Sequence, residues 1–340
     1  MKKNGEIFPI EASISKQQYG DEMFFTAFVK DITERKAMEC LLAEASKRME
    51  DELNIGKEIQ MSMLPLIFPA FPDHSEFNIF ALLESAREVG GDFYDFYFIE
   101  ENKFLFAIAD VAGKGVPSAL FMAVSKTLIK SRANEDDSPA SIVTFVNDEL
   151  SRDNKTSMFV TLFLCIIDLS TGELKYTNAG HNPPYLKRVN GEIETLNTLH
   201  GPVVGAVEDF VYKENSLIMH ANDVLLLFTD GVNEAMNIKS ELFNNDRIIQ
   251  NLNNFKGKVL ADDVKGLYNS VKIFEGEAEQ ADDITILAFE YLEPTLKDII
   301  YSETVSIKNE LAEIDRINEI FNALCEEYQI PGIIYRKFKK

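Results

Sequence analysis

Apolar runs of single-strand length occur in groups along this chain, and helix-like segments occur in pairs between the groups. The strand-like runs are 77–83, 93–99, 103–109, 158–168, 173–178, 223–228 and 284–289, and the helix-like segments are 117–132, 140–150, 242–252 and 260–274. The turn STGE at 170–173 joins two strands directly, as in a hairpin. A strictly alternating parallel α/β fold does not fit this order. We therefore expect an α+β fold, a mostly antiparallel β-sandwich with helices packed outside it.

The start of the chain has a different pattern. Apolar residues alternate over 6–15 and recur over 23–29, with YGDE between them, which predicts a β-hairpin. From residue 36 a helix is predicted, because apolar side chains return every three or four residues, at Met38, Leu42, Ala45 and Met49. Pro65 should end this helix, which either lies on its own domain or pairs with a second copy as a coiled coil. The proline-rich run at 68–73 marks a domain boundary.

The composition limits the partners of this protein. Among 340 residues, 34 Lys and Arg stand against 56 Asp and Glu, a net charge of −22. Such a chain would repel nucleic acid, whose recognition draws on clustered Lys and Arg. The longest apolar run, 158–169, is too short for a membrane span, and no signal-peptide pattern follows the first basic residues. The three cysteines form no metal or redox spacing, so we expect reduced thiols in the cytoplasm.

Several aspartates stand where an apolar strand gives way to a glycine turn or begins after a loop. They are Asp92 in GGDFYD, Asp110 in IADVAGKG, Asp230 in LLLFTDG, and the pair Asp282 and Asp283 in QADDITIL. A single aspartate in such a place is most often a turn residue. If several converge, their oxygens suit hard divalent cations. Two ions sharing one carboxylate would acidify a bridging water and favour hydrolysis of a phosphate ester.

The motifs that hold these aspartates closely resemble those of the SpoIIE-like serine/threonine phosphatases of the metal-dependent PPM class. The motifs are AREVGGDFYDF (86–96), DVAGKGVPSALFMA (110–123), AGHNPP (179–184), LLLFTDG (225–231) and ADDITIL (281–287). The resemblance runs from about residue 60 to 290 and implies a central β-sandwich flanked by helices on both faces.

The resemblance also implies a metal site with two Mn²⁺ or Mg²⁺ ions. Asp110 is expected to bridge them, with the Val111 carbonyl as a neighbouring ligand. Asp92 is expected to bind one ion, and Asp230 and Asp282 the other, with Asp283 a near-equal candidate within its pair. Many eukaryotic-type PPM enzymes carry a histidine just after the bridging Asp-Gly, whereas Val111 and Ala112 stand here, so the general acid is unassigned.

The four histidines, and the two basic residues within the aspartate motifs, are expected to have no catalytic role. A structural role is favoured for His181 in AGHNPP. His74, His200 and His220 are expected to be ordinary surface or loop residues. Arg87 and Lys114 are expected to be solvated or ion-paired.

The family resemblance implies a substrate and a domain organisation. The substrate would be a phosphorylated STAS-type anti-sigma-factor antagonist. Residues 1–35 resemble the end of a PAS sensor domain, 36–66 a helical linker that pairs in a homodimer, 67–292 the phosphatase domain, and 293–340 the start of a histidine-kinase-like ATPase domain. Regulation would then pass through the N-terminal sensor and linker.

Two other functions compete with the phosphatase. A diguanylate cyclase is suggested by GGDFY, which superficially matches GGDEF, but it leaves DVAGKG, FTDG and ADDIT unexplained. The second alternative is a non-catalytic signalling module that binds a phosphoprotein without hydrolysing it. The intact set of aspartates argues against that module.

Overall fold

The computed structural model describes residues 7–19, 22–152, 154–255 and 259–292. The chain divides into a unit Met1–Glu293 and a unit Pro294–Lys340. The second unit, which holds the expected ATPase segment, lies outside the described residues. Within the described segments, none of the helices is both long and apolar enough to cross a membrane.

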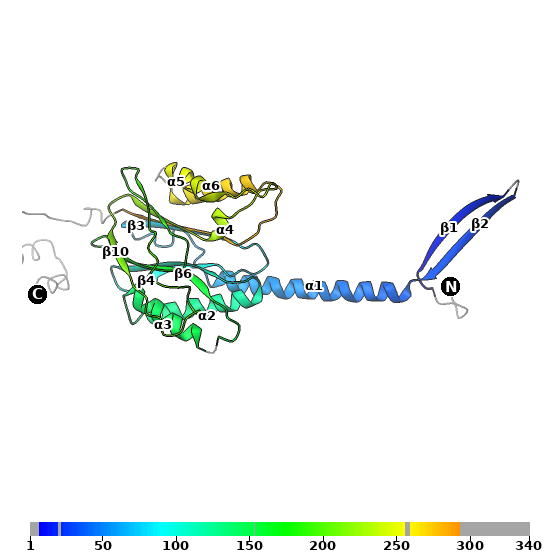
Figure 1. Ribbon diagram of the computed structural model, residues 1–340, viewed down its shortest axis with the longest axis horizontal. Coiled ribbons are helices and arrows are strands. Elements are labelled where there is room, and N and C mark those ends of the chain that lie inside the picture. Colours follow the sequence, from blue (N-terminus) through cyan, green and yellow to red (C-terminus); the bar gives the residue numbers. More distant parts are fainter. Residues whose placement is uncertain (1–6, 20–21, 153, 256–258, 293–340) are drawn as a thin grey trace, which may run out of the picture. The chain divides into compact units, whose positions relative to one another are not determined.

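Two five-stranded sheets form the centre of the first unit (Figure 1). The first sheet has the order β10-β7-β6-β5-β4, and every neighbouring pair in it is antiparallel. Its strands are β4 (Phe93–Phe98), β5 (Lys103–Val111), β6 (Val160–Asp168), β7 (Glu173–Ala179) and β10 (Asn215–Ile218). The expected hairpin between 158–168 and 173–178 is the pair β6 and β7.

The second sheet has the order β3-β12-β11-β8-β9 and is also antiparallel throughout. Its strands are β3 (Phe77–Glu84), β8 (Tyr185–Lys187), β9 (Ile193–Thr195), β11 (Asp223–Phe228) and β12 (Ile284–Tyr291). Stacked rings join the two sheets, since Phe106 of β5 lies 4.8 Å from Phe289 of β12 between ring centroids. All of β12 is buried, in keeping with its nearly continuous apolar sequence.

Helix pairs cover the outer faces of both sheets, which gives four layers (Figure 1). Helices α2 (Val116–Ala133) and α3 (Pro139–Ser151) pack on the first sheet. Helices α5 (Asn244–Asn253) and α6 (Leu260–Glu275) pack on the second, and the short α4 (Asp230–Asn233) follows β11. One apolar cluster fills the space between the sheets and under α2 and α3, and another lies under α5 and α6. The expected α+β sandwich with helices on both faces is confirmed.

The N-terminal segment contains the expected hairpin and helix. Strands β1 (Ile10–Tyr19) and β2 (Glu22–Asp31) pair antiparallel, and α1 (Thr33–Ser62) follows. The last turn of α1 is tied to the sandwich, because the Gln60 side chain donates to the Gly90 carbonyl at 2.7 Å and accepts from the Gly90 N–H at 3.2 Å. Beyond the helix, Leu64 is buried in the main apolar cluster.

Some elements differ from the sequence prediction. Strands β8, β9 and β10 and helix α4 were not expected, since elements of three or four residues are too short to show a periodic pattern. The helix expected at 242–252 begins at Asn244, because Leu242 forms a β-bridge with Met236. Helix α1 ends at Ser62, three residues before Pro65.

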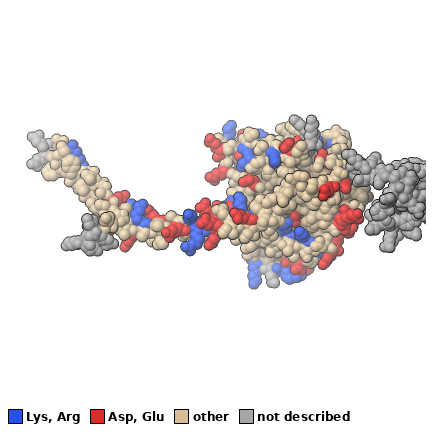
Figure 2. All heavy atoms as spheres, turned by 180° about the vertical axis from the view of Figure 1, so that it is seen from behind, with Lys and Arg blue, Asp and Glu red and all other residues tan. Residues whose placement is uncertain are grey.

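Charges of both signs are mixed on the surface. Figure 2 shows one face, on which Lys and Arg occur in small groups between Asp and Glu. On this face, neither sign of charge is confined to one end.

Candidate metal centre

The predicted aspartates come from both sheets. Asp110 lies near the end of β5, and Asp92 immediately precedes β4 in the same sheet. Asp230 begins α4 directly after β11, and Asp282 and Asp283 directly precede β12 in the other sheet. The charges of Asp230, Asp282 and Asp283 all raise the pKa of Asp110, so the five carboxyl groups act on one another across the two sheets.

Burial and like charge raise the pKa of three of these carboxyl groups, Asp92, Asp110 and Asp230. Burial, followed by the charge of Asp230, raises the pKa of Asp110 to about 7, although its hydrogen bond with Asp92 partly opposes this. Burial, followed by the charges of Asp110 and Asp283, raises the pKa of Asp92 well above its usual value. Burial and the charge of Asp282 also raise the pKa of Asp230. Negative charge is therefore in excess at the cluster, and a bound cation would offset it.

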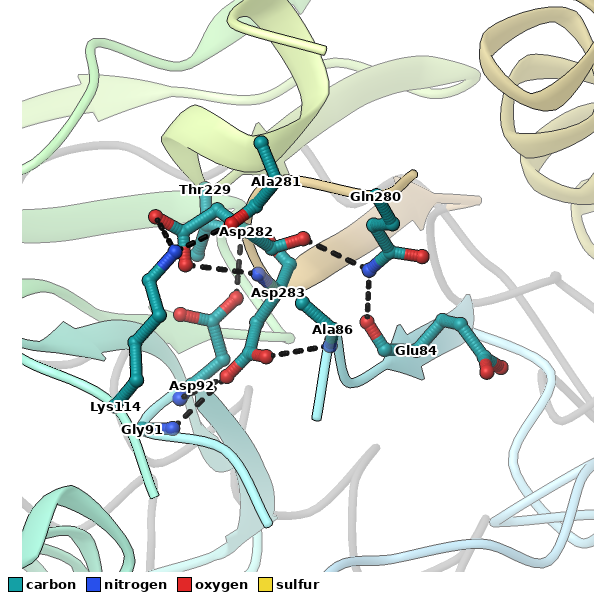
Figure 3. Close-up of polar contacts among 10 residues, drawn as sticks. All are labelled: Glu84, Ala86, Gly91, Asp92, Lys114, Thr229, Gln280, Ala281, Asp282 and Asp283. Atoms are coloured by element: carbon teal, nitrogen blue, oxygen red, sulfur yellow. Dashed lines mark hydrogen bonds and ion pairs between the residues drawn. The ribbon is translucent and has the colours of Figure 1, made fainter. Parts of the chain in front are cut away.

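Asp92 is buried and held by hydroxyl groups. Its Oδ2 accepts hydrogen bonds from Oγ1 of Thr229 at 2.7 Å and from Oγ1 of Thr285 at 2.6 Å. Thr229 follows the last residue of β11, and Thr285 is the second residue of β12. Both bonds therefore run from the second sheet to the aspartate that precedes β4 of the first. Figure 3 shows the bond from Thr229.

Asp283 is bound to backbone amides rather than directed at the other carboxylates. Its Oδ1 accepts from the Ala86 N–H at 2.8 Å, and its Oδ2 accepts from the N–H groups of Gly91 at 2.9 Å and Asp92 at 3.4 Å (Figure 3). Both of its oxygens therefore hold the 86–92 loop in place. Asp283 therefore differs from its neighbour Asp282 in its hydrogen-bond partners.

Asp282 carries an ion pair. Its Oδ2 lies 3.0 Å from Nζ of Lys114, and its Oδ1 accepts from the Asp283 N–H at 3.0 Å. Lys114 also donates to the Ala281 carbonyl (Figure 3). The expectation that Lys114 would be solvated or ion-paired is confirmed, and Arg87 is exposed.

Glycine allows the two strands of the first sheet to meet at the centre. A Cβ atom on Gly91 would lie 2.7 Å from the Val111 carbonyl oxygen, and one on Gly90 would lie 2.1 Å from Oδ2 of Asp283. Both distances are too short for non-bonded atoms. At Gly91 the clash is with the backbone, so that position requires glycine, whereas at Gly90 the Asp283 side chain would have to move. Because Gly90 and Gly91 have no side chains, the loop before Asp92 can lie against the end of β5, next to Asp110.

The chemistry of the donors fits a hard divalent cation. Carboxylate and carbonyl oxygens, with no sulfur or imidazole among the clustered groups, suit Mg²⁺ or Mn²⁺. Within the described segments, no group of three or more His, Cys, Asp or Glu side chains is arranged closely enough to hold a metal ion. The oxygens of Asp282 and Asp283 are bonded to Lys114 and to backbone amides.

The AGHNPP motif contacts residues that neighbour the aspartates. His181 is buried, its Nδ1 lies 2.8 Å from Oγ1 of Thr161, and Thr161 is the strand partner of Asp110. Burial lowers the pKa of His181 to about 4, so its ring is neutral at pH 7. Asn182 donates to the side chain of Asn233, at the end of α4. These contacts agree with the structural role expected for His181.

Among the other histidines, His200 lies in a loop, as expected. It is buried there, and its Nδ1 accepts from the Asn178 N–H at 2.9 Å.

Sequence reasoning missed three side chains that shape the centre: Gln60, Thr229 and Thr285. Both threonines stand directly beside or within the aspartate motifs FTDG and DDIT. A polar residue within an otherwise apolar strand was the available signal, since a buried hydroxyl needs a partner. Nothing in the sequence near Gln60 indicated its bonds to Gly90, which lies thirty residues away.

Comparison with solved structures defines the fold class. The SiaA-PP2C domain of Pseudomonas aeruginosa superposes with a TM-score of 0.64 at 24% identity, covering 73% of this chain and 99% of that domain. The catalytic domain of the serine threonine protein phosphatase PstP, in complex with two manganese ions, gives a TM-score of 0.50 at 14% identity, covering 64% and 99%. The described sandwich is therefore a PP2C-type fold.

Sequence comparison identifies the family. The family model for stage II sporulation protein E (SpoIIE) matches residues 100–292, more than half of the chain, and the chain belongs to this family. Protein IcfG of Synechocystis sp. is 30% identical over 266 residues, 70% of this chain and 41% of the relative. Phosphoserine phosphatase RsbU of Bacillus subtilis is 28% identical over 191 residues, 56% of this chain and 55% of the relative. The chain thus spans about half the length of these curated relatives.

Proposed function

We propose that this protein is a divalent-metal-dependent serine/threonine protein phosphatase. The observation that carries the proposal is the cluster of aspartates from both sheets, whose charges and burial raise the pKa of Asp110 and Asp92. The SpoIIE family match, the PP2C-type fold and the phosphoserine phosphatase RsbU among the relatives support it. The manganese ions of PstP support a requirement for Mn²⁺ or Mg²⁺.

The residues that would hold two ions follow from the motifs and their placement. We assign Asp110 as the shared ligand with the Val111 carbonyl beside it, Asp92 to one ion, and Asp230 and Asp282 to the other. When bound, the ions supply an acidified water and neutralise charge on a phosphoryl group. The protein's own part is to keep the carboxylates on rigid strand ends and to exclude solvent from Asp92.

The pair Asp282 and Asp283 divides into two roles in this proposal. Asp282 is the preferred ligand, because its carboxylate is half-exposed and does not bond to the 86–92 loop. Asp283 is buried and its oxygens hold the 86–92 loop, so we assign it to support of the loop that carries Asp92. The general acid stays unassigned, since His181 is buried and neutral at pH 7.

We further propose a phosphorylated STAS-type anti-sigma-factor antagonist as the substrate, and control through the N-terminal segment. The bonds between Gln60 and Gly90 support such control, because they connect the last turn of α1 to the loop before Asp92. A homodimer through α1 completes the proposal. Exposed apolar side chains along that helix, among them Met38, Leu42 and Met49, support it.

The test is hydrolysis of p-nitrophenyl phosphate and of a phosphoserine-bearing STAS protein, with Mn²⁺ and then with excess EDTA. Wild type should turn over both substrates only with metal. Asp110→Asn should lower turnover by several orders of magnitude, because it removes a charge that both ions share. Circular dichroism would show that the variant is folded.

Asp168→Asn is the matched control. Asp168 stands at the far end of β6, seven residues from the strand partner of Asp110, or about 23 Å away. It should keep wild-type activity. Near-normal turnover by Asp110→Asn would contradict the assignment of the shared ligand, and a wild type that binds Mn²⁺ without hydrolysing either substrate would favour the non-catalytic module.

A further inference from the structure

Two threonines of the second sheet hold the carboxylate of Asp92 from one side. Thr229, Thr285 and Asp92 are each at most 2% exposed, so water does not compete for their hydrogen bonds. Both hydroxyls reach the same atom, Oδ2 of Asp92, at 2.7 and 2.6 Å. Two short bonds from fixed strand positions to one oxygen define the rotation of the carboxylate plane.

The hydroxyl protons have defined directions. Oγ1 of Thr229 accepts from the Thr285 N–H at 3.0 Å, which occupies a lone pair and leaves its own proton for an acceptor. Two acceptors lie within reach, Oδ2 of Asp92 at 2.7 Å and the Asp283 carbonyl at 3.4 Å. The shorter and more direct contact is the one to Asp92. The Thr229 N–H in turn donates to the Thr285 carbonyl at 3.1 Å, so the two threonines are locked to each other.

Asp92 also interacts with Asp110 of the first sheet. The charge of Asp110 acts on the Asp92 carboxyl group, and a hydrogen bond joins the two side chains when one of them is protonated. The backbone of Asp92 is fixed as well, because Asp283 accepts from its N–H and from that of Gly91. Asp283, just before β12, therefore holds the main chain of Asp92, and Thr285, the second residue of β12, holds one oxygen of its carboxylate.

We propose that Thr229 and Thr285 are positioning residues, whose hydroxyls hold Oδ2 of Asp92 and leave Oδ1 as the oxygen that this side chain offers to a divalent cation. The inference rests on the proposed metal-dependent phosphatase function. It adds that the second sheet supplies a support for the ligand from the first sheet, in addition to its own aspartates. Loss of a group that orients a metal ligand typically costs about 10- to 100-fold in affinity.

The test is the Mn²⁺ affinity of the metal-free full chain, measured by isothermal titration calorimetry. Thr229→Val and Thr285→Val remove a hydroxyl with little change in volume, and each should weaken Mn²⁺ binding about 10- to 100-fold. Thr229→Ser and Thr285→Ser keep the hydroxyl and should bind Mn²⁺ as wild type does. In the double valine variant the two losses should not simply add, because both hydroxyls serve one oxygen.

Thr177→Val is the matched control for loss of a buried hydroxyl. Thr177 is fully buried in β7, and its hydroxyl donates to the Lys213 carbonyl at 2.9 Å. This variant should lose stability without losing Mn²⁺ affinity. In turnover of p-nitrophenyl phosphate, the Mn²⁺ concentration for half activation should rise in the two valine variants by the same factor as their dissociation constants.

Valine variants that bind Mn²⁺ as tightly as wild type would overturn the inference, and so would serine variants that lose as much affinity as the valine ones. If a valine variant does not fold, the serine variants decide, since a folded serine variant with tenfold weaker binding also overturns it. A wild type that binds Mn²⁺ but hydrolyses nothing contradicts the proposed function alone. A wild type that binds no Mn²⁺ contradicts both.

Discussion

Some residues at this centre carry negative charge, and others partly neutralise it. Lys114 is the clearest example of a residue that neutralises charge. Its ammonium lies 3.0 Å from Oδ2 of Asp282, and its charge also lowers the pKa of Asp230, against the larger effect of burial. Lys114 thus pairs with one proposed ligand and acts electrostatically on another ligand of the same ion.

Substitution of Lys114 should therefore strengthen metal binding. Lys114→Met removes a competing positive charge that is partly exposed, an effect of about 1 kcal/mol, which corresponds to about fivefold tighter binding. Mn²⁺ titration calorimetry of the metal-free protein would measure this. Lys103→Met is the control, because Lys103 pairs with Glu100 and Asp137 and stands at the other end of β5. Weaker Mn²⁺ binding by Lys114→Met would show that the ammonium supports the site.

The sequence predicts the members of the centre better than their roles. Asp92 and Asp283 are separated by 191 residues, and only the folded chain shows that Asp283 accepts from the Asp92 N–H. The choice between Asp282 and Asp283 depends on what each side chain contacts, which is Lys114 for Asp282 and the backbone of the 86–92 loop for Asp283. Thr229 and Thr285 act through hydrogen bonds between sheets, for which a single sequence contains no pattern.

Among the elements, length decides what the sequence predicts. Strands β5, β6 and β12 have eight or nine residues each, and their apolar runs are visible without any structure. Strands β8, β9 and β10 have three or four, and their existence depends on pairing with longer neighbours. The arrangement of strands in two sheets also follows from pairing, since β3 lies next to β12 at the opposite end of the sandwich sequence.

Helix α1 has exposed apolar side chains along one side. The side chains of Met38, Leu42 and Met49 are each more than 60% exposed, and their spacing of four and seven residues places them on one side of the helix. Leu42→Lys with Met49→Lys should therefore shift the full chain from dimer to monomer in sedimentation equilibrium, because two charges would enter the apolar seam.

Ala37→Lys is the control for that pair of substitutions. Ala37 lies about 140° around the helix from Leu42, so a lysine there should leave the dimer intact. A wild-type chain that sediments as a monomer at micromolar concentration would contradict the proposed dimer.

At the scale of the whole molecule, the acidic centre should make stability depend on pH in an unusual direction. An unpaired carboxyl of aspartate has a pKa of 3.8, whereas burial and neighbouring charge raise the pKa of Asp110 to about 7 in the metal-free fold. The folded state then holds this proton more tightly than the unfolded state does. The resulting stabilisation is present at low pH and is lost as pH rises from about 4 to about 7.

Urea unfolding of the metal-free protein at pH 5 and pH 7.5 would measure this dependence. The asparagine side chain of Asp110→Asn does not titrate. As pH rises, the free energy of unfolding of this variant should therefore increase relative to that of wild type, by at most about 1.4 kcal/mol per pH unit. Saturating Mn²⁺ should reverse the order by stabilising wild type, about 2.7 kcal/mol at a hundredfold excess over the dissociation constant. A difference between the two proteins that is constant with pH would contradict the shift at Asp110.

Because Gly91 lies so close to the Val111 carbonyl, the residue at position 91 indicates whether a homologue can form this centre. Any larger residue at this position would place a carbon 2.7 Å from that oxygen and force the Asp92 loop away from β5. Such a chain would keep every aspartate and lose the spacing between two of them. Reading this single position in newly sequenced genomes should therefore separate homologues able to assemble the centre from degenerate ones that retain only the scaffold.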